Sequence, residues 1–197
     1  MANNSTDNKK TLLIASDIFG LSESFLSLLE DINIPEQAII VSPYQQPQPC
    51  FENEQQAYEC FQKHGGIDAY IVSLTHIFTS HTGITKVIGF SAGAAAMYKV
   101  MSNLSISDVA LYLFYPGQIR YFLDQHPSSP CHIIFPDSES HFSLPDVTKV
   151  LKQQSNVVVE QNTYHHGFMN KDSKGFDQTA YYYYCQMLNE LLTGIKS

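Results

Sequence analysis

Short apolar runs alternate with longer amphipathic segments along most of the chain, and this rhythm constrains the fold more than any other feature. Several of the runs are apolar at consecutive positions, as in Leu12-Leu13-Ile14-Ala15 and Ala38-Ile39-Ile40-Val41. Consecutive apolar residues indicate a strand that is buried on both faces, as strands of parallel sheets are. Strands of this kind that alternate with helices predict an α/β fold with right-handed crossovers.

The pattern predicts six strands and six helices. The expected strands are 11–16, 38–42, 85–90, 109–114, 131–135 and 157–160. The expected helices are 22–29, 54–63, 67–78, 92–101, 145–153 and 178–192. A Pro/Gln-rich segment, residues 44–56, interrupts the alternation. We interpret it as an insertion near the sheet edge, as a partial lid, or as a long surface loop.

Length and composition favour one globular domain. A chain of 197 residues corresponds to one domain at about 150 residues per domain. The net charge of −8 comes without any basic cluster, so neither nucleic acid nor an anionic membrane is expected as a partner. No apolar run reaches the roughly 18 residues that a membrane-spanning helix needs. We expect a disordered tail over residues 1–10 and a single domain over residues 11–197.

The four cysteines are scattered along the chain. They are Cys50, Cys60, Cys131 and Cys185. None has CxxC or Cys/His spacing, so we expect neither a metal site nor a disulfide framework. The polar N-terminus lacks the apolar core of a secretory signal. Reduced thiols and the missing signal predict a cytoplasmic protein.

A GxSxG pentapeptide, Gly89-Phe90-Ser91-Ala92-Gly93, lies between an expected strand and an alanine-rich helix start. A sharp strand-to-helix turn of this kind is a nucleophile elbow, which holds a serine hydroxyl clear of the sheet. The serine then takes a strained backbone conformation, and side chains at Gly89 and Gly93 would collide with the closely packed chain. The pentapeptide therefore predicts that Ser91 is a nucleophile.

A histidine pair follows the last expected strand, in the stretch Tyr164-His165-His166-Gly167-Phe168. The carboxyl ends of parallel strands meet at one edge of the sheet, so this loop and the loop with Ser91 can lie side by side. The position favours His166 as the partner of Ser91 over five other histidines, which are His64, His76, His81, His126 and His132.

Four motifs together resemble the dienelactone hydrolase family, which has the α/β-hydrolase fold. They are Asp17-Ile18-Phe19-Gly20 after the first strand, the pentapeptide at 89–93, Leu113-Phe114-Tyr115-Pro116-Gly117, and His166-Gly167-Phe168. The resemblance covers roughly residues 11–194. It implies a three-layer domain with a mainly parallel six-stranded sheet in the order 2-1-3-4-5-6 and helices on both faces. The family's first antiparallel hairpin has no room before residue 11.

The resemblance also implies the roles of the site residues. Ser91 would be the nucleophile and His166 its base, whereas His165 lacks the following Gly-Phe. The backbone N–H groups of Ile18 and Ala92 would form the oxyanion hole. Asp17 matches an acidic neighbour of the nucleophile, where it would either influence proton transfer or simply close a turn through its side chain.

The acid of the triad is left open by the sequence. The family has an Asp three residues after a Gly at this point, and if Pro136 replaces that Gly, the acid position falls on Glu139. Asp137 is the alternative, which we favour less. An alignment on the following His-Phe pair puts Ser140 there, and a serine cannot act as the acid. In a further alternative, a backbone carbonyl or water orients His166.

These residues predict a serine hydrolase that cleaves small carboxylic esters, lactones or related acyl compounds through an acyl-enzyme, without metal or organic cofactor. The family's own lactonases use a cysteine, so lactone opening by a thiolate is not supported. One alternative is a catalytically inactive α/β-hydrolase-like binding protein. Another is a flavodoxin-like nucleotide binder, although the loop after the first strand offers a single glycine, Gly20. The sequence leaves the oligomeric state open.

Overall fold

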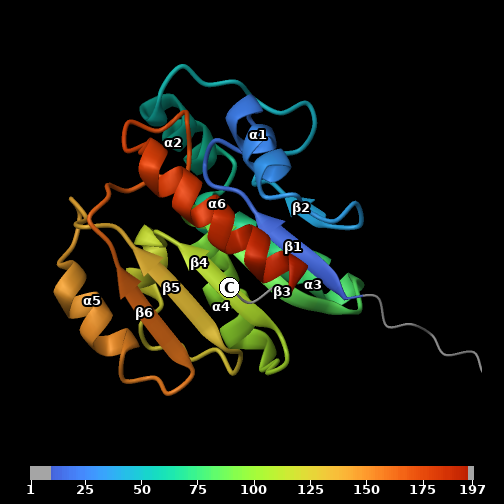
Figure 1. The fold of residues 1–197 in the computed structure, drawn as a ribbon, viewed down its shortest axis with the longest axis vertical. Coiled ribbons are helices and arrows are strands. Elements are labelled where there is room, and N and C mark those ends of the chain that lie inside the picture. The colour runs from blue at the N-terminus through green and yellow to red at the C-terminus, as the bar shows by residue number, and fades with distance from the viewer. Residues whose placement is uncertain (1–9, 195–197) are drawn as a thin grey trace, which may run out of the picture.

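The computed structural model describes residues 10–194. Its centre is one sheet of six parallel strands in the order β2-β1-β3-β4-β5-β6 (Figure 1). The predicted strand order and the parallel direction are therefore confirmed. The disordered tail predicted for residues 1–10 lies outside the described residues except for Lys10, and the single domain over 11–197 stays a prediction.

The strands and helices follow the predicted alternation. The strands are β1 (Thr11–Ala15), β2 (Ile39–Val41), β3 (Ile84–Phe90), β4 (Ala110–Phe114), β5 (Cys131–Phe135) and β6 (Val157–Gln161). The helices are α1 (Glu23–Asp31), α2 (Glu54–Lys63), α3 (Gly66–Ser80), α4 (Ala92–Leu104), α5 (Leu144–Leu151) and α6 (Gln178–Thr193). A short 3₁₀ helix, η1 (Gly117–Tyr121), was not predicted, because five residues are too few to show a periodic pattern.

Two hydrophobic cores lie on the two faces of the sheet. Successive residues of β1 point into the two cores alternately. Leu12 and Ile14 lie in the core that α1 and α6 cover. Leu13 and Ala15 lie in the core that α2, α3, α4 and α5 cover. In Figure 1, α6 crosses the near face of the sheet and α3 and α4 lie behind it.

The three layers are as predicted, and the inner strands are largely buried on both faces. The two edge strands differ from the prediction, because no neighbouring strand covers their outer side: Ile39 and Ile40 of β2 are half-buried and Val158 of β6 is exposed.

The topology brings the functional motifs to one edge of the sheet. The loops after β1, β3, β4, β5 and β6 all leave from the carboxyl ends of parallel strands, and these ends form one edge. Asp17, Ser91, Tyr115, Glu139 and His166 lie in these five loops. Within residues 10–194, no helix combines the length and the apolar character that a bilayer crossing needs.

Candidate active site

The turn from β3 to α4 holds Ser91 in an unusual conformation. Its φ of 48° and ψ of −112° lie outside the regions that side-chain-bearing residues normally adopt. The turn is fixed from both sides: the Ser91 N–H donates to the Phe114 carbonyl at 2.9 Å, and the Ser91 carbonyl accepts from the Ala95 N–H at 3.0 Å. Ser91 therefore has the strained strand-to-helix geometry of a nucleophile elbow.

The two glycines of the pentapeptide permit two different close contacts. A Cβ atom on Gly89 would lie 2.7 Å from the Cα of Ala94 in the outgoing helix. A Cβ atom on Gly93 would lie 2.7 Å from the carbonyl oxygen of Ala15 and would also collide with that of Ser16. The first glycine thus brings α4 onto β3, and the second brings α4 onto the end of β1.

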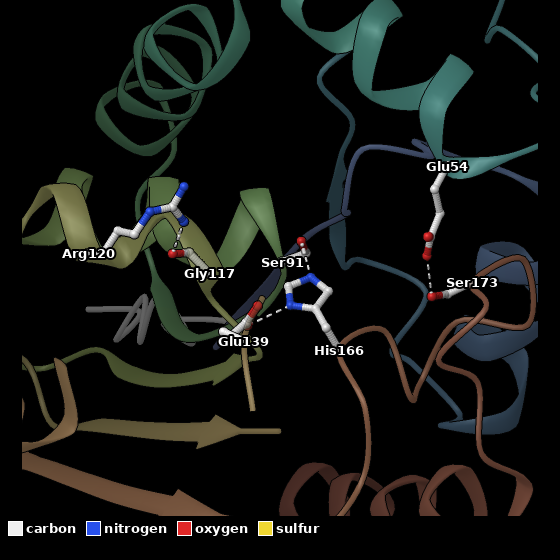
Figure 2. A network of polar contacts seen from close by, with 7 residues as sticks. All are labelled: Glu54, Ser91, Gly117, Arg120, Glu139, His166 and Ser173. Atoms are coloured by element: carbon white, nitrogen blue, oxygen red, sulfur yellow. Dashed lines mark hydrogen bonds and ion pairs between the residues drawn. The ribbon is translucent and has the colours of Figure 1, made fainter. Parts of the chain in front are cut away.

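Ser91, His166 and Glu139 form a continuous hydrogen-bonded chain (Figure 2). The distance from Ser91 Oγ to His166 Nε2 is 2.9 Å, and that from His166 Nδ1 to Glu139 Oε1 is 2.7 Å. An Nδ1–H that donates to the carboxylate leaves Nε2 free to accept the serine proton. The imidazole is 36% exposed and the Glu139 side chain only 8%, so the carboxylate is shielded behind the ring.

The alternatives to these three residues lie elsewhere in the structure. Asp137 is exposed, and its backbone joins Tyr164 and Gln161 rather than His166. Ser140 and His165 are exposed as well. Of the two candidate acids, the structure brings Glu139 to His166.

The turn after β1 presents the Ile18 N–H as a candidate oxyanion donor. The carbonyl of Asp17 accepts from the Gly20 N–H at 3.1 Å and from Ser16 Oγ at 3.2 Å. The N–H and the carbonyl of one trans peptide point in opposite directions, so these bonds fix the Ile18 N–H on the opposite side. Within residues 10–194, neither the Ile18 N–H nor the Ala92 N–H has a hydrogen-bond acceptor. Both donors are free for a ligand.

Asp17 is buried beneath this turn, with 5% of its surface exposed. One carboxylate oxygen accepts from the Phe19 N–H at 2.9 Å, which is the turn-closing bond expected as one of its two roles. The other accepts from Asn170 Nδ2 at 2.7 Å. Burial raises the pKa of Asp17 to about 6, although these two hydrogen bonds and the nearby His166 act in the opposite direction.

Asn170 was missed by the sequence analysis. It lies four residues after His166 and is buried, at 6% exposure. The one sequence signal for its role is an asparagine close to the histidine motif. That signal becomes informative only once the structure shows that the loop folds inward and buries Asn170.

Part of the Pro/Gln-rich segment packs on the same turn. Tyr44 is buried, and its hydroxyl donates to the Ile18 carbonyl at 2.6 Å. The side-chain oxygen of Gln48 accepts from the Leu21 N–H at 3.2 Å, and the ring of Phe51 packs 6.4 Å from that of Phe19. Since β2 is the edge strand, the segment is an insertion at the sheet edge, and it supports the turn after β1.

The Tyr-Pro-Gly turn after β4 packs against His166. Tyr115 has a φ of 40°, and its buried ring lies 5.0 Å from the imidazole, measured between centroids. Burial raises the pKa of its hydroxyl well above the ordinary value. A Cβ atom on Gly117 would lie 3.4 Å from His166 Cε1 and 3.5 Å from Glu139 Oε1. This turn therefore packs closely against the histidine and the acid.

The four cysteines are free thiols. Across the part of the chain that the structure describes, no three His, Cys, Asp or Glu side chains gather in a way that could hold a metal ion. The chemistry that this site offers is that of the Ser91–His166–Glu139 chain and its two free N–H donors.

Comparison with known proteins gives one sequence relative. No family model matches the chain. The uncharacterized protein YczH of Bacillus subtilis (strain 168) is 31% identical over 134 residues. These residues make up 66% of this chain and 65% of that protein, so the chain spans just under two thirds of its relative's length.

Solved structures resemble the chain over nearly its whole length. The dienelactone hydrolase-like promiscuous phosphotriesterase P91, from metagenomic libraries, has a TM-score of 0.58 and 12% identity, covering 95% of this chain and 87% of its own. A Xanthomonas campestris protein described as a hydrolase of the alpha/beta superfamily has a TM-score of 0.57 and 14% identity, and the match covers 94% of this chain and 98% of that protein. Est1E from Butyrivibrio proteoclasticus has a TM-score of 0.56 and 12% identity, and the match covers 98% of this chain and 91% of Est1E. The chain has the α/β-hydrolase fold, as predicted.

Proposed function

We propose that the protein is a serine hydrolase that cleaves small carboxylic esters, lactones or related acyl compounds through an acyl-enzyme. The observation that carries this proposal is the unbroken chain from Ser91 Oγ to His166 and on to Glu139, at 2.9 and 2.7 Å. The strained turn beneath Ser91 and the free N–H groups of Ile18 and Ala92 support it. The dienelactone hydrolase-like phosphotriesterase and the alpha/beta-superfamily hydrolase among the structural neighbours agree with a hydrolytic reaction, and two further neighbours are described as esterases.

Acylation begins with the Ser91 hydroxyl. As its oxygen attacks the ester carbonyl carbon, the proton passes to His166 Nε2, and the shielded carboxylate of Glu139 stabilises the imidazolium. The negative charge that forms on the carbonyl oxygen lies between the Ile18 and Ala92 N–H groups. Such donors stabilise the transition state more than the substrate, and the loss of one costs about 100- to 1000-fold in rate.

Deacylation repeats these steps with water. Once His166 has given its proton to the alcohol that departs at the end of acylation, it takes a proton from the water that attacks the acyl-enzyme. The N–H pair again stabilises the charged intermediate. Its bond to Ser91 Oγ then breaks, His166 Nε2 returns its proton to that oxygen, and the acid leaves. The nucleophile, the base, the acid and the oxyanion donors that these reaction steps use are all residues of the chain.

A fluorophosphonate tests the proposal, because it reacts with a serine that a working base has activated. We expect intact mass to show one adduct on the wild-type protein and none on Ser91→Ala or His166→Ala. On any ester that the protein hydrolyses, Ser91→Ala should lose about 10⁴-fold or more of kcat. Equal hydrolysis by Ser91→Ala would refute the proposal, provided that circular dichroism shows both proteins folded.

Two expectations remain attached to this proposal. Membership of the dienelactone hydrolase family, which the four motifs imply, stays a prediction. A cytoplasmic location, which the scattered cysteines and the polar N-terminus indicate, also stays a prediction. The inactive binding protein is disfavoured by the intact Ser91–His166 hydrogen bond. The nucleotide binder is disfavoured because the buried carboxylate of Asp17 lies in the loop where a phosphate would bind.

A further inference from the structure

Two distant segments of the chain are joined beside the candidate active site. Asn170, in the loop after His166, bonds Asp17, in the turn after β1, across 153 positions of sequence. Two residues further on, the carboxylate of Asp172 accepts from Ser22 Oγ at 2.6 Å and from Ser24 Oγ at 2.7 Å. The first contact is buried and the second is exposed, so only the first is shielded from water.

The buried contact acts on the peptide that carries the oxyanion donor. Asp17 contributes its own carbonyl to the peptide whose N–H belongs to Ile18. Its carboxylate is held at both oxygens, by the Phe19 N–H on one side and by Asn170 on the other. The carboxylate closes the turn from Asp17 to Phe19 by accepting from the Phe19 N–H, and the Ile18 N–H lies within that turn. A carboxylate that Asn170 holds in place therefore also keeps the Ile18 N–H in position.

Asn170 is itself fixed to the histidine loop. Its N–H donates to the Gly167 carbonyl at 2.8 Å, one residue after His166. Its side-chain oxygen accepts from the Asp172 N–H at 2.8 Å, which leaves Nδ2 directed at Asp17. An amide suits this position because it donates to a carboxylate and accepts from an N–H at once, which neither a lysine nor an ionised aspartate can do.

We propose that Asn170 is a positioning residue that, through Asp17, holds the Ile18 N–H in place for the transition state of the reaction proposed above. This inference rests on the proposed function, since the Ile18 N–H matters only if an oxyanion forms. The hydrogen bonds of Asn170 within the described residues go to Asp17, Gly167, Asp172 and Ser173 and not to Ser91. Asn170 joins the oxyanion turn to the loop of the catalytic base, so that donor and base keep one relative position.

The groups around Asp17 leave few partners that could stabilise its negative charge, and the Asn170 amide is one of them. The tyrosines near Asp17, which are Tyr44, Tyr70 and Tyr115, carry no charge at physiological pH, and burial raises the pKa of each hydroxyl further above its ordinary value. Asp172 is a second carboxylate nearby and His166 is the ionisable base. The Asn170 amide and the Phe19 N–H stabilise the ionised form of Asp17, which is the form that accepts at both oxygens.

The experiment is a charge-swap cycle with Asp17→Asn, Asn170→Asp and the double variant. Each single variant places two like groups against each other. In Asp17→Asn, the amide donors of positions 17 and 170 face each other, and in Asn170→Asp, two carboxylate acceptors do. In the double variant, the new amide at position 17 would donate to the new carboxylate at position 170, and the bonds from the Phe19 and Asp172 N–H groups remain possible. The matched control is Ser24→Ala, which removes a contact between the same two segments away from Ile18.

The readouts are the rate constant of fluorophosphonate labelling, and kcat and KM on p-nitrophenyl acetate, with thermal unfolding measured beside them. We expect each single variant to lose about tenfold or more in labelling rate and kcat, with KM changed less than about threefold. The double variant should recover to within about threefold of wild type. Ser24→Ala should stay within about twofold.

The two proposals fail in different ways. A wild-type protein that is folded but never labelled would overturn the proposed function and this inference together. Normal labelling of wild type and of both single variants would leave the proposed function standing and overturn the role of Asn170. So would a double variant that regains the wild-type melting temperature but not the rate, since the contact would then serve stability alone.

Discussion

The turn that carries Ser91 and the loop that carries Glu139 contribute to the same hydrogen-bonded chain, but they are built in opposite ways. At Ser91 the backbone decides: the turn is strained, its N–H and carbonyl are both bonded, and Gly89 and Gly93 leave no space for a side chain. In the loop after β5, Asp137, Ser138 and Ser140 are exposed, and the Glu139 carboxylate is held by its hydrogen bond to His166 and by packing against Gly117.

The difference separates two ways of placing a catalytic group. A backbone-imposed position is encoded by a short local sequence and tolerates almost no change there. A position imposed by side-chain contacts tolerates changes in the loop around it, provided that the contacts survive. The predictions below test this difference, beginning with the largest expected effect.

Gly93→Ala should be the most damaging change. The new methyl group would meet the carbonyl oxygens of Ala15, the last residue of β1, and of Ser16, whose N–H is bonded to Val41, so this backbone has little freedom to move aside. We expect a loss of about 4 kcal/mol or more in the free energy of unfolding, measured by urea denaturation. Gly194→Ala is the control, since that glycine ends α6 with φ of 72° and has open space around it. It should cost only about 1 kcal/mol. Equal costs would show that the turn is not the rigid region.

Glu139→Gln should reduce kcat about 100- to 10,000-fold with little change in stability. The amide cannot stabilise an imidazolium as a carboxylate does, and it allows the wrong tautomer of His166. The measurement is kcat on an ester substrate. Asp137→Asn, two residues away on the exposed surface, should keep kcat within about twofold. If Asp137→Asn proved the worse variant, the assignment of the acid would be reversed.

The buried carboxylate of Asp17 should make stability depend on pH. Its pKa rises from 3.8 to about 6 on folding because of burial, so the folded protein binds more protons than the unfolded chain between these values. The free energy of unfolding should therefore fall as pH rises from about 4 to about 6, by up to about 3 kcal/mol, and level off above.

The measurement is the difference in unfolding free energy between wild type and Asp17→Asn across this pH range. The substitution removes the titrating group, and any other cost it has is a constant offset. A difference that does not change between pH 4 and pH 6 would contradict the raised pKa.

Tyr44→Phe should have the smallest effect. It removes the hydroxyl that donates to the Ile18 carbonyl and keeps the buried ring. We expect a loss of about 1 kcal/mol in stability and a decrease of a few fold in kcat, because the turn has a second support at Gln48. Tyr58→Phe, on the exposed side of α2, is the control and should change neither quantity. A tenfold loss of kcat in Tyr44→Phe would make the Pro/Gln-rich segment part of the catalytic support.

Most of the fold could be predicted from local patterns, because buried parallel strands and amphipathic helices have distinct periods. The strand order followed from the family resemblance, and η1 was missed because one 3₁₀ turn has no period to detect. At the site, Ser91 and His166 were identified from motifs that set the backbone locally. Glu139 remained one of two candidate acids, because the residues next to each carboxylate in the sequence do not determine which carboxylate is buried. Asn170 had no local signal at all.

The sequence alone determined the alternation of strands and helices, the elbow at Ser91 and the motif around His166. In each case a short stretch of residues restricts its own backbone, through glycines, β-branched runs or a turn. Only the tertiary structure decided that Glu139 rather than Asp137 faces His166, that Asn170 binds Asp17, and that Tyr44 supports Ile18. These contacts join loops far apart in the chain, and they exist because a parallel sheet gathers the carboxyl ends of its strands at one edge.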